Sequence, residues 1–171
     1  MIRRHFMTLA LAAGFSAAVA PSVRADGSAV AIVTMFYKIS AGMDGKYSGS
    51  SIFFQDKIRT KYFSKRLRAE LAALDKKSKQ KDEPGIDFDP VTDSQDPSVK
   101  DLKIEQDGES DGESAVKASF SYEDGGERKF VRYVFVRQND AWKLDNMSSG
   151  PAADGWDMRK LIKDIMDGFS K

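Results

Sequence analysis

The spacing of apolar residues changes near the middle of this 171-residue sequence, and that change restricts the fold. Across residues 55–77 apolar side chains recur every three or four positions, which is the period of an amphipathic helix. Later they alternate, as at Val116, Ala118 and Phe120, which is the period of a half-buried strand. Because helical and strand patterns occupy separate parts of the sequence, we predict an α+β fold.

Two further segments are candidates for helices. The run at residues 29–37 is almost wholly apolar, and its length fits either a buried strand or a helix. The C-terminal segment places five apolar residues on one helical face, and Asp154 or Asp157 precedes them as a predicted N-cap. These five residues are Met158, Leu161, Ile162, Ile165 and Phe169.

Four strands are predicted before the C-terminal helix, with turns at residues 124–126 and 139–140. The segment 129–137 is apolar on both faces, so we expect a central strand that is covered on both sides. The tandem Asp-Gly-Glu-Ser sequences at 107–110 and 111–114 are interpreted as an enlarged loop between two strands. The expected architecture is N-terminal helices, a four-stranded antiparallel meander and a C-terminal helix.

Residues 1–25 have the pattern of an export signal. Arg3 and Arg4 precede 15 mostly apolar residues, and Val23-Arg24-Ala25 resembles a cleavage site. An arginine pair near an aromatic residue also resembles a twin-arginine signal, so the Sec and twin-arginine routes both stay open. We expect residues 26–171 to form a single domain, exported to the periplasm and not embedded in a membrane.

Loss of this signal changes the chemistry that the chain offers. The only histidine leaves with it, and the sequence has no cysteine. The 27 Lys and Arg fall to 24, because three arginines are removed, against 26 Asp and Glu. The mature chain therefore lacks histidine-dependent nucleophiles and imidazole or thiolate metal sites. We expect no cofactor and no metal.

Charge is unevenly distributed along the sequence. Residues 57–81 hold ten Lys and Arg with two acidic residues, whereas residues 82–113 hold twelve Asp and Glu with two lysines. A nucleic-acid partner is disfavoured, because the chain is expected to be exported and Tyr62 and Phe63 lie on the apolar side of the basic segment. The two blocks are interpreted as facing each other or solvent, and a charged partner surface stays open.

The most distinctive segment is residues 85–96, within a long connection predicted at residues 78–98. Aspartates that precede proline or lie in turns accept backbone N–H groups, and this is the preferred interpretation. The same oxygen-rich side chains could also gather around calcium or contact a polar ligand. The acidic residues are Asp87, Asp89, Asp93 and Asp96, and Gln95 adds an amide. We take all of these except Asp93 as candidate ligand-binding residues.

Several short motifs together resemble a known family. They are the Asp-x-Asp-Pro and Gln-Asp of this loop, Phe63-Ser64, Trp142 to Met147, and the Met158 to Leu161 helix. Across residues 28–167 the chain resembles bacterial exported proteins and lipoproteins that form a domain family of unknown function. The resemblance implies a nuclear transport factor 2-like, or cystatin-like, roll in which a curved sheet wraps around helices. It also implies that residues 29–37 are a helix.

A roll of this kind implies a concave pocket between helix and sheet. Tyr37, Tyr133 and Trp142 would face a ligand there, or else they belong to the core. The function expected first is a non-catalytic periplasmic binding module for an unknown small molecule or envelope protein. The alternatives are an inhibitor or immunity-type protein that blocks an envelope enzyme, and an enzyme that works with carboxylates.

Overall fold

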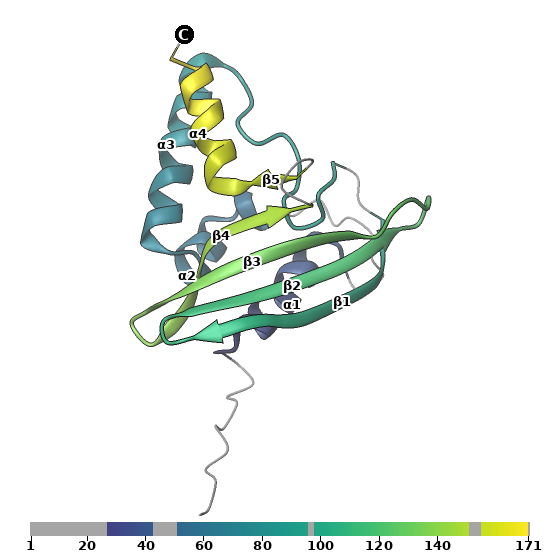
Figure 1. Cartoon of the computed structure of the whole chain (residues 1–171). Helices are drawn as coiled ribbons and strands as arrows, with labels where there is room; N and C mark the ends of the chain where they lie inside the picture. The colour runs from purple at the N-terminus through teal and green to yellow at the C-terminus, as the bar shows by residue number, and fades with distance from the viewer. Residues whose placement is uncertain (1–26, 43–50, 96–97, 151–154, 171) are drawn as a thin grey trace, which may run out of the picture.

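The computed structural model describes residues 27–42, 51–95, 98–150 and 155–170. It confirms the predicted α+β class, because helices precede and follow an antiparallel sheet (Figure 1). The predicted export signal, most of the Gly- and Ser-rich segment at residues 42–51, and Asp96 lie outside the described residues. In the part of the chain that is described, no helix combines the length and apolar character needed to cross a bilayer.

The apolar run at residues 29–37 is helical, as the resemblance implied. Helix α1 spans Ala29–Ser40, and the Ser28 hydroxyl caps it by accepting the Ala31 N–H at 3.1 Å. Its buried side includes Phe36 and Tyr37, which pack against the sheet. The strand alternative for this run is therefore wrong.

The single helix predicted for residues 55–77 is two helices. A 3₁₀ turn, η2 (Ile52–Phe54), leads into α2 (Asp56–Tyr62), and α3 (Lys65–Lys81) follows. Phe63 breaks the pattern because it is extended, almost fully buried and bridged to Leu144, whose carbonyl accepts the Ser64 N–H at 2.8 Å. Ser64 then caps α3 by accepting the Leu67 N–H.

The sheet has five strands instead of the predicted four, and their order follows the chain. The strands are β1 (Val99–Ser110), β2 (Glu113–Tyr122), β3 (Lys129–Gln138), β4 (Ala141–Ser149) and β5 (Trp156–Asp157). Strand β5 has only two residues, so it is too short to show an alternating pattern. The Asp-Gly-Glu-Ser repeat is also not a loop, because only residues 111–112 separate β1 from β2.

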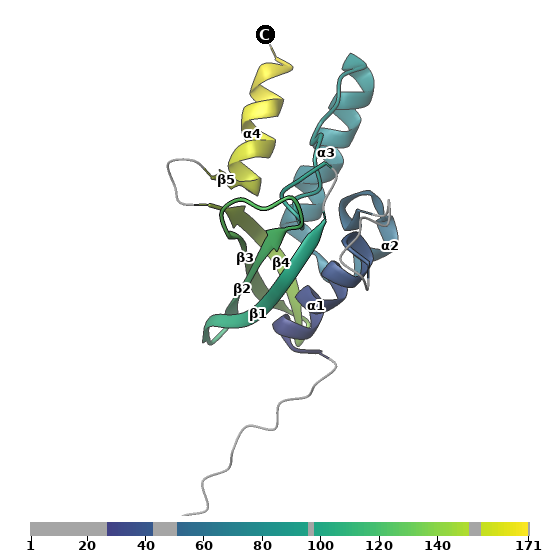
Figure 2. The same cartoon turned by 90° about the vertical axis from the view of Figure 1, so that its right-hand side faces the viewer.

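Strand β3 is central, but it is not covered on both sides as predicted. Its Val131, Tyr133 and Phe135 side is buried, whereas Phe130 and Val134 on the other side are only half-buried. Helix α1 lies against one side of the sheet (Figure 2). The exposed side is shielded by long polar side chains, such as Lys117, whose Nζ lies 4.8 Å from the Phe130 ring centroid.

Helix α4 (Met158–Gly168) closes the fold with its predicted N-cap, since Asp157 accepts the N–H groups of Arg159 and Lys160. Met158 and Ile162 are buried. Leu161 is only half-buried, because the buried side of α4 faces α3 and β4 and Leu161 lies at the edge of that side.

Candidate functional site

The connection after α3 is fixed to that helix before it reaches the distinctive aspartates. Asp82 ends α3 in the left-handed conformation, and its N–H donates to the Ser78 carbonyl. Gly85 then approaches the helix so closely that a Cβ there would lie 2.9 Å from Ser78 Oγ. The sequence therefore places glycine where the loop packs against α3, and this contact positions the residues that follow.

Asp89 organises the turn that this loop makes. Its Oδ1 accepts the Val91 N–H at 3.0 Å across Pro90 and the Ser51 hydroxyl at 3.3 Å. Its backbone N–H donates to the Ser94 carbonyl at 3.0 Å. The preferred interpretation of the aspartates as turn-forming residues is thus confirmed at Asp89, which is 4% exposed.

Burial also changes the acidity of Asp89. Desolvation raises the pKa of its carboxyl, and hydrogen bonding from the Val91 N–H and the Ser51 hydroxyl partly offsets that increase. Ser40 lies beside the carboxylate, but Ser40 Oγ and Asp89 Oδ2 do not reach hydrogen-bond geometry with any described partner. The turn therefore holds one carboxylate oxygen that is buried without a well-formed hydrogen bond.

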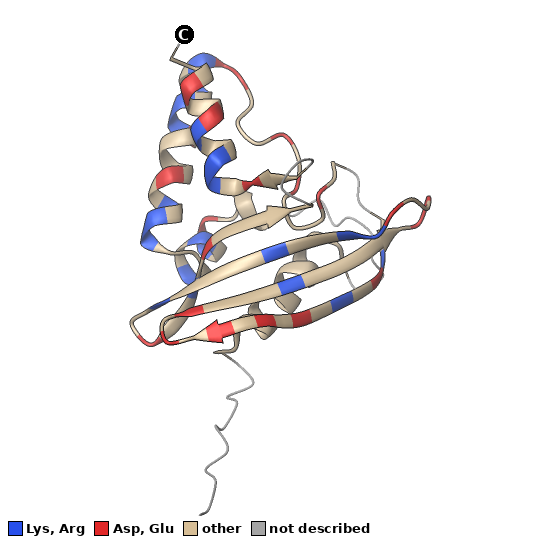
Figure 3. Ribbon diagram, viewed as in Figure 1, with Lys and Arg blue, Asp and Glu red and all other residues tan. Residues whose placement is uncertain are grey.

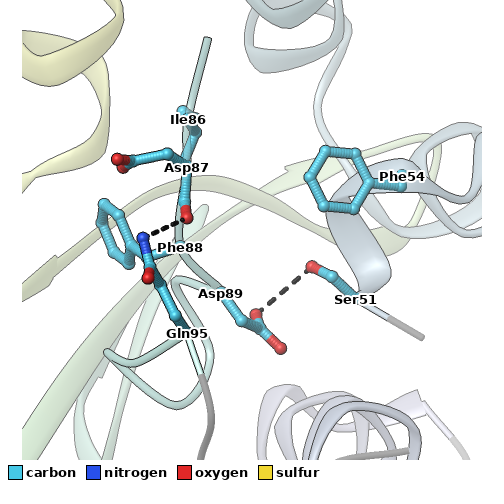
Figure 4. A pocket seen from close by; sticks show the side chains of 7 residues that line it. All are labelled: Ser51, Phe54, Ile86, Asp87, Phe88, Asp89 and Gln95. Carbon is cyan, nitrogen blue, oxygen red and sulfur yellow. Dashed lines mark hydrogen bonds between the residues drawn. The ribbon is translucent and has the colours of Figure 1, made fainter. Parts of the chain in front are cut away.

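An open pocket of about 400 Å³ lies on the outer side of this turn (Figure 4). Phe54 of η2 stands on one side, and the chain from Ile86 to Asp89 forms the other. The Gln95 side chain is held across that chain, since its Nε2 donates to the Asp87 carbonyl at 3.0 Å. The seven lining residues are Ser51, Phe54, Ile86, Asp87, Phe88, Asp89 and Gln95.

The structure thus brings three predicted site residues, Asp87, Asp89 and Gln95, to one pocket. Their carboxylates do not converge, because the side chains of Asp87 and Asp89 point in different directions (Figure 4). Asp93 is engaged elsewhere, since its Oδ1 accepts the Trp156 Nε1–H at 2.5 Å. Among the residues that the structure describes, no three His, Cys, Asp or Glu side chains are grouped as metal ligands.

Tyr37 and Tyr133, which were predicted to face a ligand, lie in the core beneath the loop. Tyr133 Oη is within 3.4 Å of the Val91 carbonyl, and the rings of Tyr37 and Tyr133 pack edge to face at 6.4 Å. Burial raises the pKa of both phenols, so both stay protonated and neutral. Neither tyrosine lines the pocket.

Trp142 lies in a different part of the molecule. It follows the β3–β4 turn, is 8% exposed, and packs under the guanidinium of Arg137 at 5.0 Å from its ring centroid. It does not line the pocket formed by the loop. Trp142 was expected with the two tyrosines in the pocket that a cystatin-like roll implies, and the structure places it apart from them.

Sequence reasoning missed the residues that complete the pocket and hold its loop. Ser51 and Phe54 come from the segment before α2, which has no periodic pattern to place it. The Tyr122 hydroxyl donates to the Thr92 carbonyl at 2.7 Å, and the Trp156 ring packs against Phe88 at 5.5 Å. Of these residues, only Tyr122 has a signal in the sequence, because the alternating pattern of β2 places it on the buried face.

Two other hollows lie on the surface of the described residues. One, of about 400 Å³, shares Phe54 and Ile86 with the loop pocket and runs along the C-terminal end of α3. The other, of about 650 Å³, lies beside Trp156 and Leu161 and contains no predicted site residue. The loop pocket is therefore the one in which sequence and structure agree.

No protein-family model, curated protein or solved structure matches this chain. The function must therefore be argued from the chemistry of the pocket and of the surrounding surface.

Proposed function

We propose that the mature chain is a non-catalytic periplasmic binding module, and that the loop pocket binds its small ligand. The observation that carries this proposal is the lining, in which apolar side chains of Phe54, Ile86 and Phe88 lie beside carboxylate and amide groups. A concave site of several hundred Å³ with a few polar groups is the usual form of a small-molecule site.

The polar groups of the pocket favour a particular ligand chemistry. Asp87 and Asp89 offer acceptor oxygens, and Gln95 uses its amide nitrogen on the Asp87 carbonyl, which leaves its oxygen as an acceptor. We therefore propose a ligand that combines an N–H or O–H donor with an apolar portion, such as an amine or a sugar. A small anion does not fit this lining.

The arrangement supports binding over catalysis. A general base needs a free oxygen or nitrogen within hydrogen-bond reach of the substrate proton. Asp89 Oδ1 is already occupied by Val91 and Ser51, and its Oδ2 is buried. The exposed carboxylate of Asp87 points in a different direction from that of Asp89, so the two do not form an acid–base pair (Figure 4). We propose that the polar groups near the pocket hold its shape and contact the ligand.

The wider architecture is compatible with the cystatin-like roll that the sequence resembles, and we propose that fold assignment as well. Its support is the order of elements, with helices before the sheet and α4 after it, and the packing of α1 on one side of the sheet. We propose export of residues 26–171 on the sequence pattern. Intact-mass measurement of periplasmic extract should give a chain that begins at Asp26.

Ligand binding is tested by thermal-shift screening of purified residues 26–171 against panels of amines, sugars and anions. We expect amines or sugars to raise the melting temperature and anions to have no effect. Asp87→Ala is the informative variant, because its exposed side chain lines the pocket and makes no described hydrogen bond. Asp101→Ala, an exposed aspartate on β1, is its control. A hit that stabilises wild type and Asp87→Ala equally would contradict this site.

A further inference from the structure

The basic residues of α2 and α3 form a surface that the loop pocket does not use. Seven lysines of these helices have no ion pair among the described residues, and five of them, all exposed, lie on α2 and on the outward side of α3. We call these five the basic face: Lys57, Lys61, Lys65, Lys76 and Lys79. Lys79 borders the hollow along the C-terminal end of α3.

The spacing of α3 explains why its lysines share one side. Its outward positions are Lys65, Ala69, Ala72, Lys76 and Lys79, all of them exposed and all separated by three or four residues. The buried side of the same helix carries Leu67, Leu71 and Leu74. At 1.5 Å per residue the outward positions from Lys65 to Lys79 extend over about 21 Å, with small alanines between the lysines.

The charge at the start of α3 opposes the stability of that helix. Its first turn contains Lys65, Arg66 and Arg68 and no acidic residue, although the positive end of the helix dipole lies there. Arg66 is paired with Asp145, but Lys65 has no ion partner in the described chain. Such departures from the local rules of helix stability are expected where a surface serves a function.

The acidic residues of β1 lie away from this face, whereas Asp75, Asp82 and Glu83 adjoin it at the C-terminal end of α3, where Asp75 pairs with Arg59 of α2. Helices α2 and α3 contact β4, whereas the acidic strand β1 is at the other end of the sheet order. Figure 3 shows the blue residues of α3 and the red residues of β1 in separate regions. Because the mature chain is nearly neutral, attraction to an anionic partner must come from this local face and would orient the molecule.

An exposed aromatic residue adjoins the basic face. Phe54 is 69% exposed and lies two residues before α2. It lines the same hollow as Lys79, together with Asp75, Asp82 and Glu83. Aromatic side chains beside lysines are typical of helices that lie on a lipid surface, where the ring enters the headgroup layer and the lysines meet anionic lipids. The lysines are spread over an exposed surface and form no closed pocket. Such an arrangement suits an extended layer of charged lipid headgroups better than a single small ligand.

We propose that the η2–α2–α3 face docks the protein onto an anionic phospholipid bilayer surface, through the basic face and Phe54. Binding is peripheral and electrostatic, so salt reverses it. Lysines near an anionic surface each strengthen binding roughly fivefold, so the face supplies a reversible attachment. Phe54 also lines the loop pocket, but none of the five lysines does, so the charge-dependent part of this proposal does not depend on the function proposed for that pocket.

The test is cosedimentation of residues 26–171 with vesicles that contain phosphatidylglycerol in phosphatidylcholine, compared with phosphatidylcholine alone. We expect binding only to the anionic vesicles and release at high salt. The variant Lys57→Glu with Lys65→Glu should weaken binding on the order of twentyfold or more. Both substitutions lie in first turns of helices, where glutamate is favoured, so the variant should fold.

Matched controls separate this face from general electrostatics. Lys100→Glu with Lys129→Glu makes the same change in net charge at exposed positions on β1 and β3, and should alter binding less than about threefold. Phe54→Ser should weaken vesicle binding, whereas Leu102→Ser, at the exposed apolar residue of β1, should not.

Three results would overturn the proposal. The first is failure of the wild type to bind anionic vesicles at low salt, and the second is an equal loss in the two charge-reversed variants. The third is binding to polyglutamate or duplex DNA as tight as to vesicles, with no effect of Phe54→Ser on vesicle binding. That result would show an acidic polymer, and not a bilayer, as the partner.

Discussion

The loop at residues 82–95 and the basic face both carry many charges, but they use them differently. In the loop, Asp89 and Asp93 accept hydrogen bonds from Val91, Ser51 and Trp156, so their carboxylates determine the path of the chain. On the basic face the lysines have no ion partner in the described structure. Charge that organises the fold is thus buried or half-buried and hydrogen-bonded, whereas charge that is exposed and unpaired is available to a partner.

The two sides of α3 give the largest expected difference in stability. Leu71 is fully buried, and Leu71→Ala should lower the free energy of unfolding by about 2 to 5 kcal/mol, because it leaves a cavity. Lys76→Ala, on the basic face, should change it by less than about 0.5 kcal/mol. Urea denaturation of both variants measures this. Equal losses would mean that the lysine side is also part of the folded core.

Asp89 tests whether the loop charges are structural. Asp89→Ala should cost about 1 to 3 kcal/mol, because the buried Val91 N–H and Ser51 hydroxyl lose their acceptor. Asp87→Ala, at an exposed position in the same pocket, is the control and should have little effect on stability. Chemical denaturation should be run with calcium and with chelator. A calcium-dependent midpoint in the wild type that Asp89→Ala abolishes would show a cation site instead.

The outcome at Asp89 was predictable from sequence because it depends on neighbours in the chain. An aspartate before Pro90 forms a turn with Val91 two residues on, and this needs no tertiary information. Ser51 and Phe54 were not predictable, since they reach the pocket only when η2 packs near the loop. Local chemistry thus identified one side of the pocket, and the other side depends on the fold.

The fold shows the same limit. The β2, β3 and β4 strands and the caps at Ser64 and Asp157 follow from alternation and capping rules. The break at Phe63 does not, because Tyr62 and Phe63 fit the helical period and only pairing with the distant Leu144 decides against a continuous helix. Periodicity alone also left α1 ambiguous, and the family resemblance decided it.

The carboxyl of Asp89 should also make stability depend on pH, and this effect should be smaller than that of removing the side chain. Burial raises the pKa of Asp89 in the folded state, so the protonated form is favoured there. Its contribution to stability is therefore complete below the unfolded pKa and is lost as pH rises through the folded pKa. Relative to Asp89→Asn, the wild type should gain stability as pH falls from about 8 toward about 4. Parallel stability curves for the two proteins would show that Asp89 is not desolvated.

The smallest expected effect concerns Lys65 and has the opposite sign. Because the first turn of α3 contains no acidic residue, Lys65→Glu should raise the free energy of unfolding by about 0.3 to 1 kcal/mol at low ionic strength. The gain should shrink in high salt, and Lys65→Gln should give a smaller increase. Urea denaturation at two salt concentrations measures it. A loss of stability in Lys65→Glu would mean that the lysine contributes to the fold, and the basic face would then need no partner to explain it.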